Sequence, residues 1–153
     1  MGASLARALG MKFIDGDDLH PRANKEKMAA GCALTDDDRI PWLEIIADRI
    51  GAEFSDGHPI IVACSSLKRS YRTLLTAKAP STVFVHLRGA RDVIAERQSL
   101  RNHEFMPDSL LGSQLDTLEP LQSDERGVLV DLTHAPDDIV RSVTRELTKN
   151  FVD

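Results

Sequence analysis

Acidic residues early in the chain have the chemistry of a site for a hydroxyl-bearing ligand. Asp15, Asp17 and Asp18 follow the apolar pair Phe13-Ile14, and His20 comes next. A carboxylate in such a place can accept a hydroxyl proton or hold Mg²⁺ through water. The tetrapeptide from Asp15 to Asp18, taken alone, is more readily explained as a solvated turn. A single His is usually a structural residue, so His20 adds little by itself.

A second group combines hydroxyls with positive charge. Ser65 and Ser66 precede Lys68, Tyr71 and Arg72 at the expected start of a helix. Hydroxyls, free N–H groups of a helix start and two cations one turn apart together suit a carboxylate or a phosphate. When Lys68 and Arg72 are considered in isolation, a solvated helix face is the more common explanation.

A third group is a series of arginines, which comprises Arg88, Arg91, Arg97 and Arg101, with His103 following. In phosphoryl transfer, arginines on a mobile lid stabilise charge on the moving group. A plain amphipathic helix surface is the alternative. All three groups follow predicted strand ends, where open α/β sheets place their ligands.

The elements that position these groups alternate between strand and helix. Short apolar runs predict strands at 12–15, 59–64, 82–87 and 127–131. Helices are predicted at 2–9, 21–30, from Thr35 to about 54, from Ser65 or Ser66 to about 78, 90–100, a stretch to about 117, and 136–149. Alternation of this kind predicts parallel pairing through right-handed crossovers, and hence an α/β fold.

The longest predicted helix has a clear start and a core face. Thr35 and Asp38 form a capping-box pattern. Trp42, Ile46 and Ile50 then recur every four residues, and Phe54 continues the series. This stripe is predicted to be core rather than a ligand site.

Composition limits the remaining possibilities. A chain of 153 residues with 42% hydrophobic and 28% charged residues is predicted to form one domain, 1–153. A net charge of −5 disfavours binding to nucleic acid or to an anionic membrane. We expect a cytoplasmic protein, since no signal segment or membrane-spanning run is found. Cys32 and Cys64 lack metal-ligand spacing, so reduced thiols are expected.

In their order and spacing, the motifs resemble the gluconate kinase family, relatives of shikimate and adenylate kinases, and the resemblance covers nearly all 153 residues. The motifs that carry it are Leu9-Gly10 through Phe13 to Pro21; Asn24 to Met28; Leu34 to Leu43; Ala63 to Lys68; Tyr71-Arg72; His103 with Phe105-Met106-Pro107; and Gln114 with Thr117 to Pro120. The resemblance implies a P-loop kinase-like three-layer fold with a parallel sheet. It also implies transfer of the ATP γ-phosphoryl group to D-gluconate, giving 6-phosphogluconate, with Mg²⁺.

The resemblance also implies roles for single residues. Asp17 would orient or deprotonate the acceptor hydroxyl, and Asp15 would help to position Mg²⁺. The polyol and its carboxylate would be bound by His20, Lys68, Tyr71, Arg72 and His103, with Asn24 and Lys27 near the same pocket. On the nucleotide side, Arg97 and Arg101 would act from a lid at about 97–120, and the loop from Thr133 to Pro136 would lie near adenine. A homodimer is left open.

The chain departs from the family pattern at its start. It contains no Gly-Lys pair, and so no G-x-x-x-x-G-K-[ST] phosphate loop. Helix 2–9 resembles the helix that follows this loop in the family, so roughly 15 to 25 residues of strand and loop would precede it. The absent strand would lie between the strands at 59–64 and 82–87. We therefore expect reduced stability and negligible catalysis from these 153 residues alone. Glu104, after His103, also departs from the usual His-Phe-Met sequence.

Three hypotheses follow. The first is an ordinary gluconate kinase whose strand and phosphate loop are encoded upstream of Met1. The second is a non-catalytic remnant that binds gluconate or a kinase partner. The third is a kinase for another small hydroxy acid, such as shikimate. The first is favoured because the substrate-side residues are intact, whereas a decaying gene would be expected to lose them as well.

Overall fold

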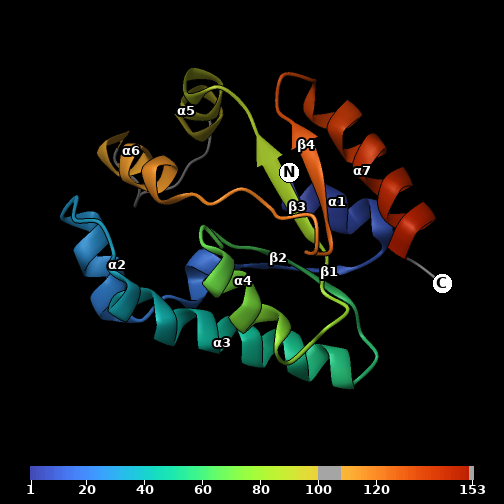
Figure 1. The fold of residues 1–153 in the computed structure, drawn as a ribbon, viewed down its shortest axis with the longest axis horizontal. Coiled ribbons are helices and arrows are strands. Elements are labelled where there is room, and N and C mark those ends of the chain that lie inside the picture. Colours follow the sequence, from blue (N-terminus) through green and yellow to red (C-terminus); the bar gives the residue numbers. More distant parts are fainter. Residues whose placement is uncertain (100–107, 152–153) are drawn as a thin grey trace.

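Parallel strands lie between two layers of helices, which confirms the predicted α/β class (Figure 1). The structure is a computed structural model that describes residues 1–99 and 108–151. The strands are β1 (Lys12–Asp15), β2 (Ile60–Ala63), β3 (Phe84–Arg88) and β4 (Gly127–Asp131). The helices are α1 (Gly2–Leu9), the 3-10 helix η1 (Gly16–Leu19), α2 (Arg22–Ala29), α3 (Asp36–Ser55), α4 (Arg69–Thr76), α5 (Arg91–Ser99), α6 (Asp108–Thr117) and α7 (Pro136–Phe151).

The strands form two separate parallel pairs. Strand β1 pairs with β2, with Lys12 opposite Ile60, and β3 pairs with β4, with Phe84 opposite Gly127. No strand pairing joins β2 to β3 within the described residues. The division therefore falls at the position where the sequence predicts the absent central strand.

The hydrophobic side chains form two clusters, one on the α1 and α7 side of the strands and one on the α3 and α4 side (Figure 1). Helix α7 packs on β4, and α1 packs on α7, β1 and β2; the buried residues of this cluster are Leu5, Val128, Val130, Leu132, Ile139, Val140 and Val143. Helices α3 and α4 form the second cluster, with Trp42, Leu43, Ile46, Ala47, Leu67, Tyr71 and Leu75. Ile61 of β2 packs against the first cluster, and Phe84 of β3 packs against the second. Side chains thus connect the two strand pairs where backbone pairing does not.

Most helix boundaries agree with the sequence. Gly10 adopts a left-handed conformation with φ of 66° directly after α1, as a C-terminal glycine should. At the start of α3, Thr35 and Asp38 form the predicted capping box. Trp42 and Ile46 are fully buried, but Phe54 is 49% exposed. The predicted core stripe therefore ends before the last turn of α3.

The start of α4 was predicted wrongly. The helix begins at Arg69 and ends at Thr76, and the residue before it, Lys68, makes no side-chain capping bond. The Ser65 hydroxyl instead accepts a hydrogen bond from Arg39 at 3.3 Å. Its carbonyl accepts from the Leu67 N–H at 2.9 Å, so this segment is a turn before the helix.

Strand β2 is less covered than its apolar sequence predicts. All four of its residues are only partly buried. Such a run was expected to be covered on both faces, as in the interior of a parallel sheet. The physical reason is that β2 pairs on one side only within the described residues.

Two further observations complete the fold. Cys32 and Cys64 are free thiols, as predicted, and burial raises the pKa of Cys64 to about 12. Among the helices in residues 1–99 and 108–151, none has the length and apolar character needed to span a membrane.

Candidate active site

The loop after β1 presents a carboxylate at the edge of the sheet. In this acceptor loop (residues 15–20), Asp15 Oδ1 accepts the N–H of Asp17 at 3.1 Å, which caps η1. Gly16 is buried, and a Cβ on it would lie 2.4 Å from the carbonyl oxygen of Ala63. Trp42 donates its indole N–H to the Gly16 carbonyl at 2.7 Å. The backbone is thus held against β2 and α3, while the Asp17 side chain stays half-exposed.

His20 closes the acceptor loop as a buried residue. Its ring stacks on Trp42, with 3.9 Å between ring centroids and 14° between ring planes. Its Nδ1 lies 3.3 Å from Asn24 Nδ2, and its Nε2 lies 4.0 Å from Asp17 Oδ1. Burial, with Arg39 and Lys25 nearby, lowers the pKa of His20 from 6.5 to about 4. The imidazole is therefore neutral at physiological pH.

Asn24 and Lys27 on α2 both bind the first turn of α3. Asn24 donates to the backbone carbonyl of Asp38 at 2.8 Å, and the Lys27 ammonium pairs with the Asp38 carboxylate. The Lys27 hydrogen bond, helped by those from Thr35, lowers the pKa of Asp38 to about 2. These predicted substrate-side residues therefore lie together, but both already have protein partners.

Lys68 and Tyr71 converge on a carboxylate that the sequence analysis did not assign to the site. Lys68 Nζ lies 2.8 Å from each oxygen of Asp36, and the Tyr71 hydroxyl donates to the same carboxylate. Burial, followed by the hydrogen bond to Asp36, raises the pKa of Tyr71 to about 12, whereas Lys68 lowers the pKa of Asp36. The sequence feature that could have indicated Asp36 is the run of three Asp residues at the start of α3.

Arg39 is a second residue that was missed. It is a buried cation, 6% exposed, on the first turns of α3. Its side chain donates to the Leu34 carbonyl at 3.4 Å and to the Ser65 hydroxyl at 3.3 Å. The positive charge acts on His20 and Asp36, and it lowers the pKa of both. The start of α3 thus links the acceptor loop to the Lys68 and Tyr71 group.

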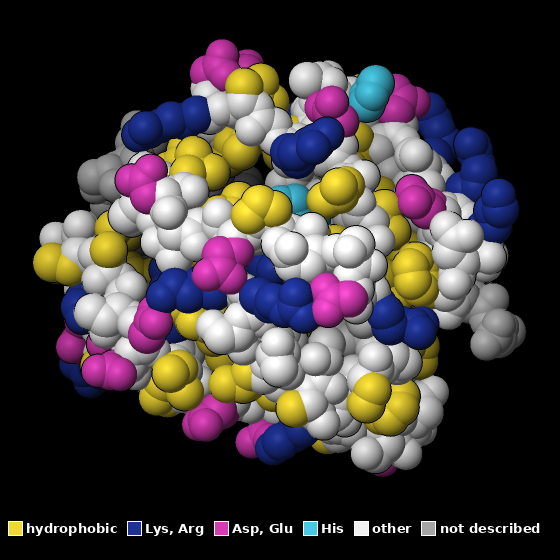
Figure 2. All heavy atoms as spheres, in the orientation of Figure 1, with side chains coloured by type: hydrophobic (Ala, Val, Ile, Leu, Met, Phe, Trp, Pro, Cys, Tyr) yellow, Lys and Arg dark blue, Asp and Glu magenta, His cyan; other side chains and the backbone are white. Residues whose placement is uncertain are grey.

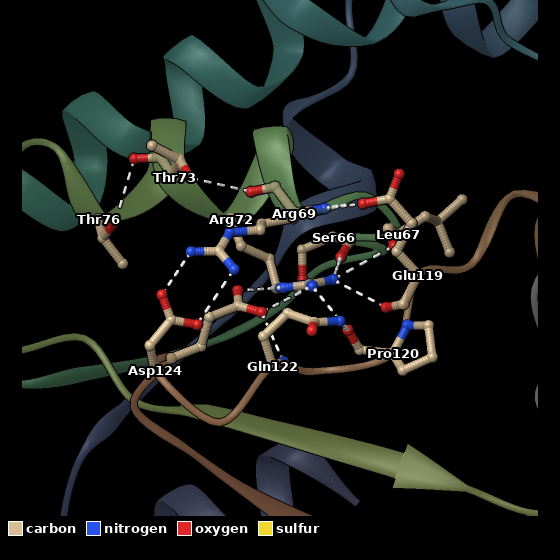
Figure 3. A network of polar contacts seen from close by, with 11 residues as sticks. Ser66, Leu67, Arg69, Arg72, Thr73, Thr76, Glu119, Pro120, Gln122 and Asp124 are labelled. Atoms are coloured by element: carbon tan, nitrogen blue, oxygen red, sulfur yellow. Dashed lines mark hydrogen bonds and ion pairs between the residues drawn. The ribbon is translucent and has the colours of Figure 1, made fainter.

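Arg72 is placed differently from the other predicted substrate residues. It is only 2% exposed, and it forms a bidentate pair with Glu125 at 2.6 and 2.9 Å. Its remaining N–H groups donate to the backbone carbonyls of Ser66, Leu67, Glu119 and Pro120 (Figure 3). Arg72 therefore anchors the segment after α6 to α4. Binding of the polyol by Arg72 stays a prediction, and it would require displacement of Glu125.

A second ion pair lies beside this anchor. Arg69 forms a bidentate pair with Asp124 at 3.1 and 2.6 Å, and the Arg69 backbone N–H donates to Glu119 at 2.7 Å. Unlike Arg72, Arg69 is half-exposed. Figure 2 shows that basic and acidic side chains alternate in a band across the middle of this face. Paired charges of this kind leave little net field on the surface they occupy.

The predicted nucleotide-side residues meet at the ends of β3 and β4. Arg97 on α5 donates to the backbone carbonyl of His134 at 2.6 Å. In the same loop, the Thr133 N–H donates to Asp131 Oδ1 at 2.8 Å, and Pro136 is the first residue of α7. Arg101 and His103 lie outside the described residues, as does Glu104.

The residues can be tested for a fit to Mg²⁺. Within the described part of the chain, no group of three or more His, Cys, Asp or Glu side chains is arranged to hold a metal ion. In phosphoryl-transfer sites, however, Mg²⁺ usually binds one or two carboxylates together with substrate phosphates and water. Asp15, at the carboxyl end of β1, fits as one such carboxylate.

Surface depressions do not mark the acceptor loop. One, of about 290 Å³, is lined by Arg69, Arg72, Phe84, Glu125 and their neighbours. Another, of about 390 Å³, lies between α3 and α4 near Lys78. Neither depression is lined by residues of the acceptor loop. The candidate site is therefore defined by its side-chain contacts.

Comparisons with known proteins find relatives of one kind. The chain is 39% identical over 167 residues to a probable gluconokinase of Xenopus tropicalis, covering 99% of this chain and 88% of that protein. It is 41% identical over 145 residues to a gluconokinase of Gluconobacter oxydans (strain 621H), covering 95% and 82%. No family model matches the chain.

The chain is also similar to solved structures of a gluconokinase and a sugar kinase. A gluconokinase from Sinorhizobium meliloti 1021 has a TM-score of 0.86 and 44% identity, covering 98% of this chain and 84% of that one. An unliganded sugar kinase from Janibacter sp. HTCC2649 has a TM-score of 0.86 and 41% identity, covering 96% and 83%.

Proposed function

Since this chain belongs to the gluconokinase family, we propose that the residues after β1 and β2 form the gluconate-binding half of an ATP-dependent kinase. The reaction is phosphorylation of D-gluconate to 6-phosphogluconate. One observation carries the proposal: the first turn of α3 contacts both groups. Asp38 binds Asn24, which contacts His20 of the acceptor loop, and Asp36 binds Lys68 and Tyr71. Gluconate is a polyol that carries a carboxylate, so its site needs hydroxyl-binding and carboxylate-binding groups side by side.

We propose roles for these residues that the geometry supports. The exposed Asp17 carboxylate accepts the proton of the acceptor hydroxyl, and His20 binds the polyol beside it. Lys68 and Tyr71 both bind the Asp36 carboxylate. A gluconate carboxylate offers the same two acceptor oxygens, so it can replace Asp36 on these donors. Asn24 and Lys27 fix the walls of this site.

On the nucleotide side, we propose that Arg97 and Arg101 contact the phosphates from the lid at about 97–120. The loop from Thr133 to Pro136 then borders adenine. The hydrogen bond from Arg97 to the His134 carbonyl supports this grouping, because it brings α5 to that loop. Mg²⁺, when bound with ATP, would neutralise charge on the transferred phosphoryl group, and Asp15 would hold it.

Calorimetric titration with D-gluconate tests the binding half directly. We expect gluconate to bind and D-sorbitol, which has the polyol chain without the carboxylate, to bind much more weakly; shikimate tests the alternative acceptor. Lys68→Met should weaken gluconate binding by about tenfold or more, because a charge-assisted bond is lost. Lys149→Met, at an exposed position on α7, is the matched control. Equal binding of sorbitol and gluconate to the folded chain would contradict the proposal.

Turnover is a separate question. The 153 residues contain no Gly-Lys pair, and each preorganised donor of a phosphate cradle can be worth ~10² to 10³ in rate. We propose that these residues alone bind gluconate without turnover. An ADP-release assay should detect activity only in a version that carries a strand and a G-x-x-x-x-G-K-[ST] loop before Gly2. Equal rates of ADP release from the 153 residues alone and from the version with the added strand and loop would contradict this proposal. Light scattering on both versions tests the possible homodimer.

A further inference from the structure

His20 is held on one ring face by Trp42 and at one ring edge by Asn24. Trp42 is fully buried, and its indole N–H already binds the acceptor loop at the Gly16 carbonyl. Its ring covers the imidazole at 3.9 Å. Asn24, which is 5% exposed, lies at the Nδ1 edge of the same imidazole. The position of the imidazole is therefore set from both α2 and α3.

The contacts of Asn24 also determine where His20 carries its proton. Asn24 Nδ2 lies 2.8 Å from the Asp38 carbonyl oxygen, which can only accept. The atom at this position must therefore be the amide nitrogen and not the amide oxygen. The same nitrogen lies 3.3 Å from His20 Nδ1, and it has only hydrogens to offer there. Nδ1 must supply a lone pair, so the proton of the neutral ring is on Nε2.

The Nε2–H is directed to the side of the site where Asp17 lies. The distance from Nε2 to Asp17 Oδ1 is 4.0 Å, which is too long for a direct hydrogen bond. Two partners that each lie about 2.8 Å from one shared oxygen, at an angle of roughly 90°, are about this far apart. A single hydroxyl can therefore donate to Asp17 and accept from His20 at the same time.

We propose that Trp42 and Asn24 are positioning residues that hold His20 as its neutral Nε2–H tautomer, so that His20 and Asp17 bind one hydroxyl of the acceptor between them. The part that concerns the acceptor rests on the proposed function; the tautomer does not. The charged groups around His20 are Asp17 on η1, Lys25 on α2 and Arg39 on α3. The two cations oppose a charged imidazole and therefore favour the neutral ring.

The tautomer can be measured without any ligand. Long-range ¹H–¹⁵N NMR spectra of the histidine ring near pH 7 should show His20 with the proton on Nε2 and a bare Nδ1. His20→Gln identifies the signal among the five histidines. A proton on Nδ1, or an even mixture of the two tautomers, overturns the proposal.

The chain contains a single Trp, so its fluorescence reports on His20 directly. A protonated imidazole stacked on indole quenches its emission more than a neutral one does. We expect quenching with a midpoint near pH 4 in the original chain and none in His20→Gln. Asn24→Ala should raise the midpoint by roughly one pH unit, because Nδ1 no longer faces a donor. Asn150→Ala, at an exposed site on α7, should leave it unchanged.

Three outcomes separate the positioning role, the proposed function and the shared hydroxyl. Circular dichroism at each pH distinguishes quenching from acid unfolding, and a midpoint near 6.5 in the folded chain overturns the positioning role. Gluconate should shift the His20 Nε2–H resonance, whereas sorbitol should do so only at much higher concentration. A folded chain with the expected tautomer that fails to bind gluconate in calorimetry refutes the proposed function and leaves the tautomer established. Gluconate binding without a shift of this resonance overturns the shared hydroxyl.

Discussion

At the scale of single residues, the acceptor loop is shaped by contacts from distant parts of the chain. Gly16 lies so close to β2 that a side-chain carbon would meet the Ala63 carbonyl, and Trp42 binds the Gly16 carbonyl from α3. The loop sequence supplies the acidic residues, while the neighbouring elements fix where they point. The position of Asp17 thus depends on residues of β2 and α3 as well as on its own loop.

Gly16→Ala tests this dependence. A Cβ 2.4 Å from a backbone oxygen forces the loop away from β2, and we expect a loss of ~1 to 3 kcal/mol in the free energy of unfolding. Gly112→Ala on α6 is the matched control, because its Cβ would meet only the flexible end of Arg91 at 3.0 Å. Urea unfolding measures both variants. A cost for Gly16→Ala no larger than that of the control would show that the loop is not held this closely.

His20 should also make stability depend on pH. Its pKa in the folded chain, about 4, lies below its ordinary value of 6.5, so the unfolded chain binds more protons between these values. The contribution of His20 to the free energy of unfolding is complete above about pH 6.5. It falls by up to ~3 kcal/mol as the pH drops toward 4.

Urea unfolding should therefore show that the free energy of unfolding falls less between pH 7 and pH 5 in His20→Gln than in the original chain. His86 provides an internal comparison, since burial lowers its pKa as well and it is retained in the variant. An identical pH dependence in both chains would mean that His20 titrates normally.

At the scale of elements, a buried ion pair links α4 to the segment after α6. Arg72 and Glu125 are both mostly buried, and Arg72 lowers the pKa of Glu125. The Glu119 N–H also donates to the Leu67 carbonyl at 2.8 Å, beside the same anchor. The turn before α4 is thus fixed by the chain that returns from α6.

Arg72→Met should destabilise the protein by about 3 to 5 kcal/mol, because it leaves Glu125 charged and buried without its partner. The double variant Arg72→Met with Glu125→Met should recover part of this loss. Arg69→Met is the matched control on the same helix, and its exposed pair with Asp124 should contribute much less. Equal effects of Arg69→Met and Arg72→Met in urea unfolding would contradict a special role for the buried pair.

The same elements show what the sequence could and could not predict. Helix α3 and its capping box are local, so the pattern of Thr35, Asp38 and Trp42 was sufficient to predict them. The pairing of Arg72 with Glu125 spans 53 residues, and no local pattern indicates it. The prediction of the start of α4 was wrong for the same reason, because Ser65 is bound by Arg39 from another helix. Side-chain roles at the site could be listed from motifs, but Asp36 and Arg39 required the fold.

At the scale of the whole molecule, the division of the sheet leaves an open strand edge. The Phe84 N–H donates to Arg126, and the Arg88 carbonyl accepts from Leu132, so alternate residues of β3 face β4. The backbone groups of Val85 and Leu87 therefore point to the opposite edge, toward the gap between the strand pairs. Leu87 is 40% exposed, which agrees with an uncovered edge. Among the described residues, no strand pairs with this edge.

Hydrogen exchange measured by NMR should therefore alternate along β3. The amide of His86, which faces β4, should exchange more slowly than those of Val85 and Leu87 by about tenfold or more, since only it is held in a strand pair. A version with an added strand in the gap should protect Val85 and Leu87 and leave His86 nearly unchanged. Uniform protection along β3 in the original chain would mean that its second edge is already paired, and the two halves of the sheet would then be continuous in solution.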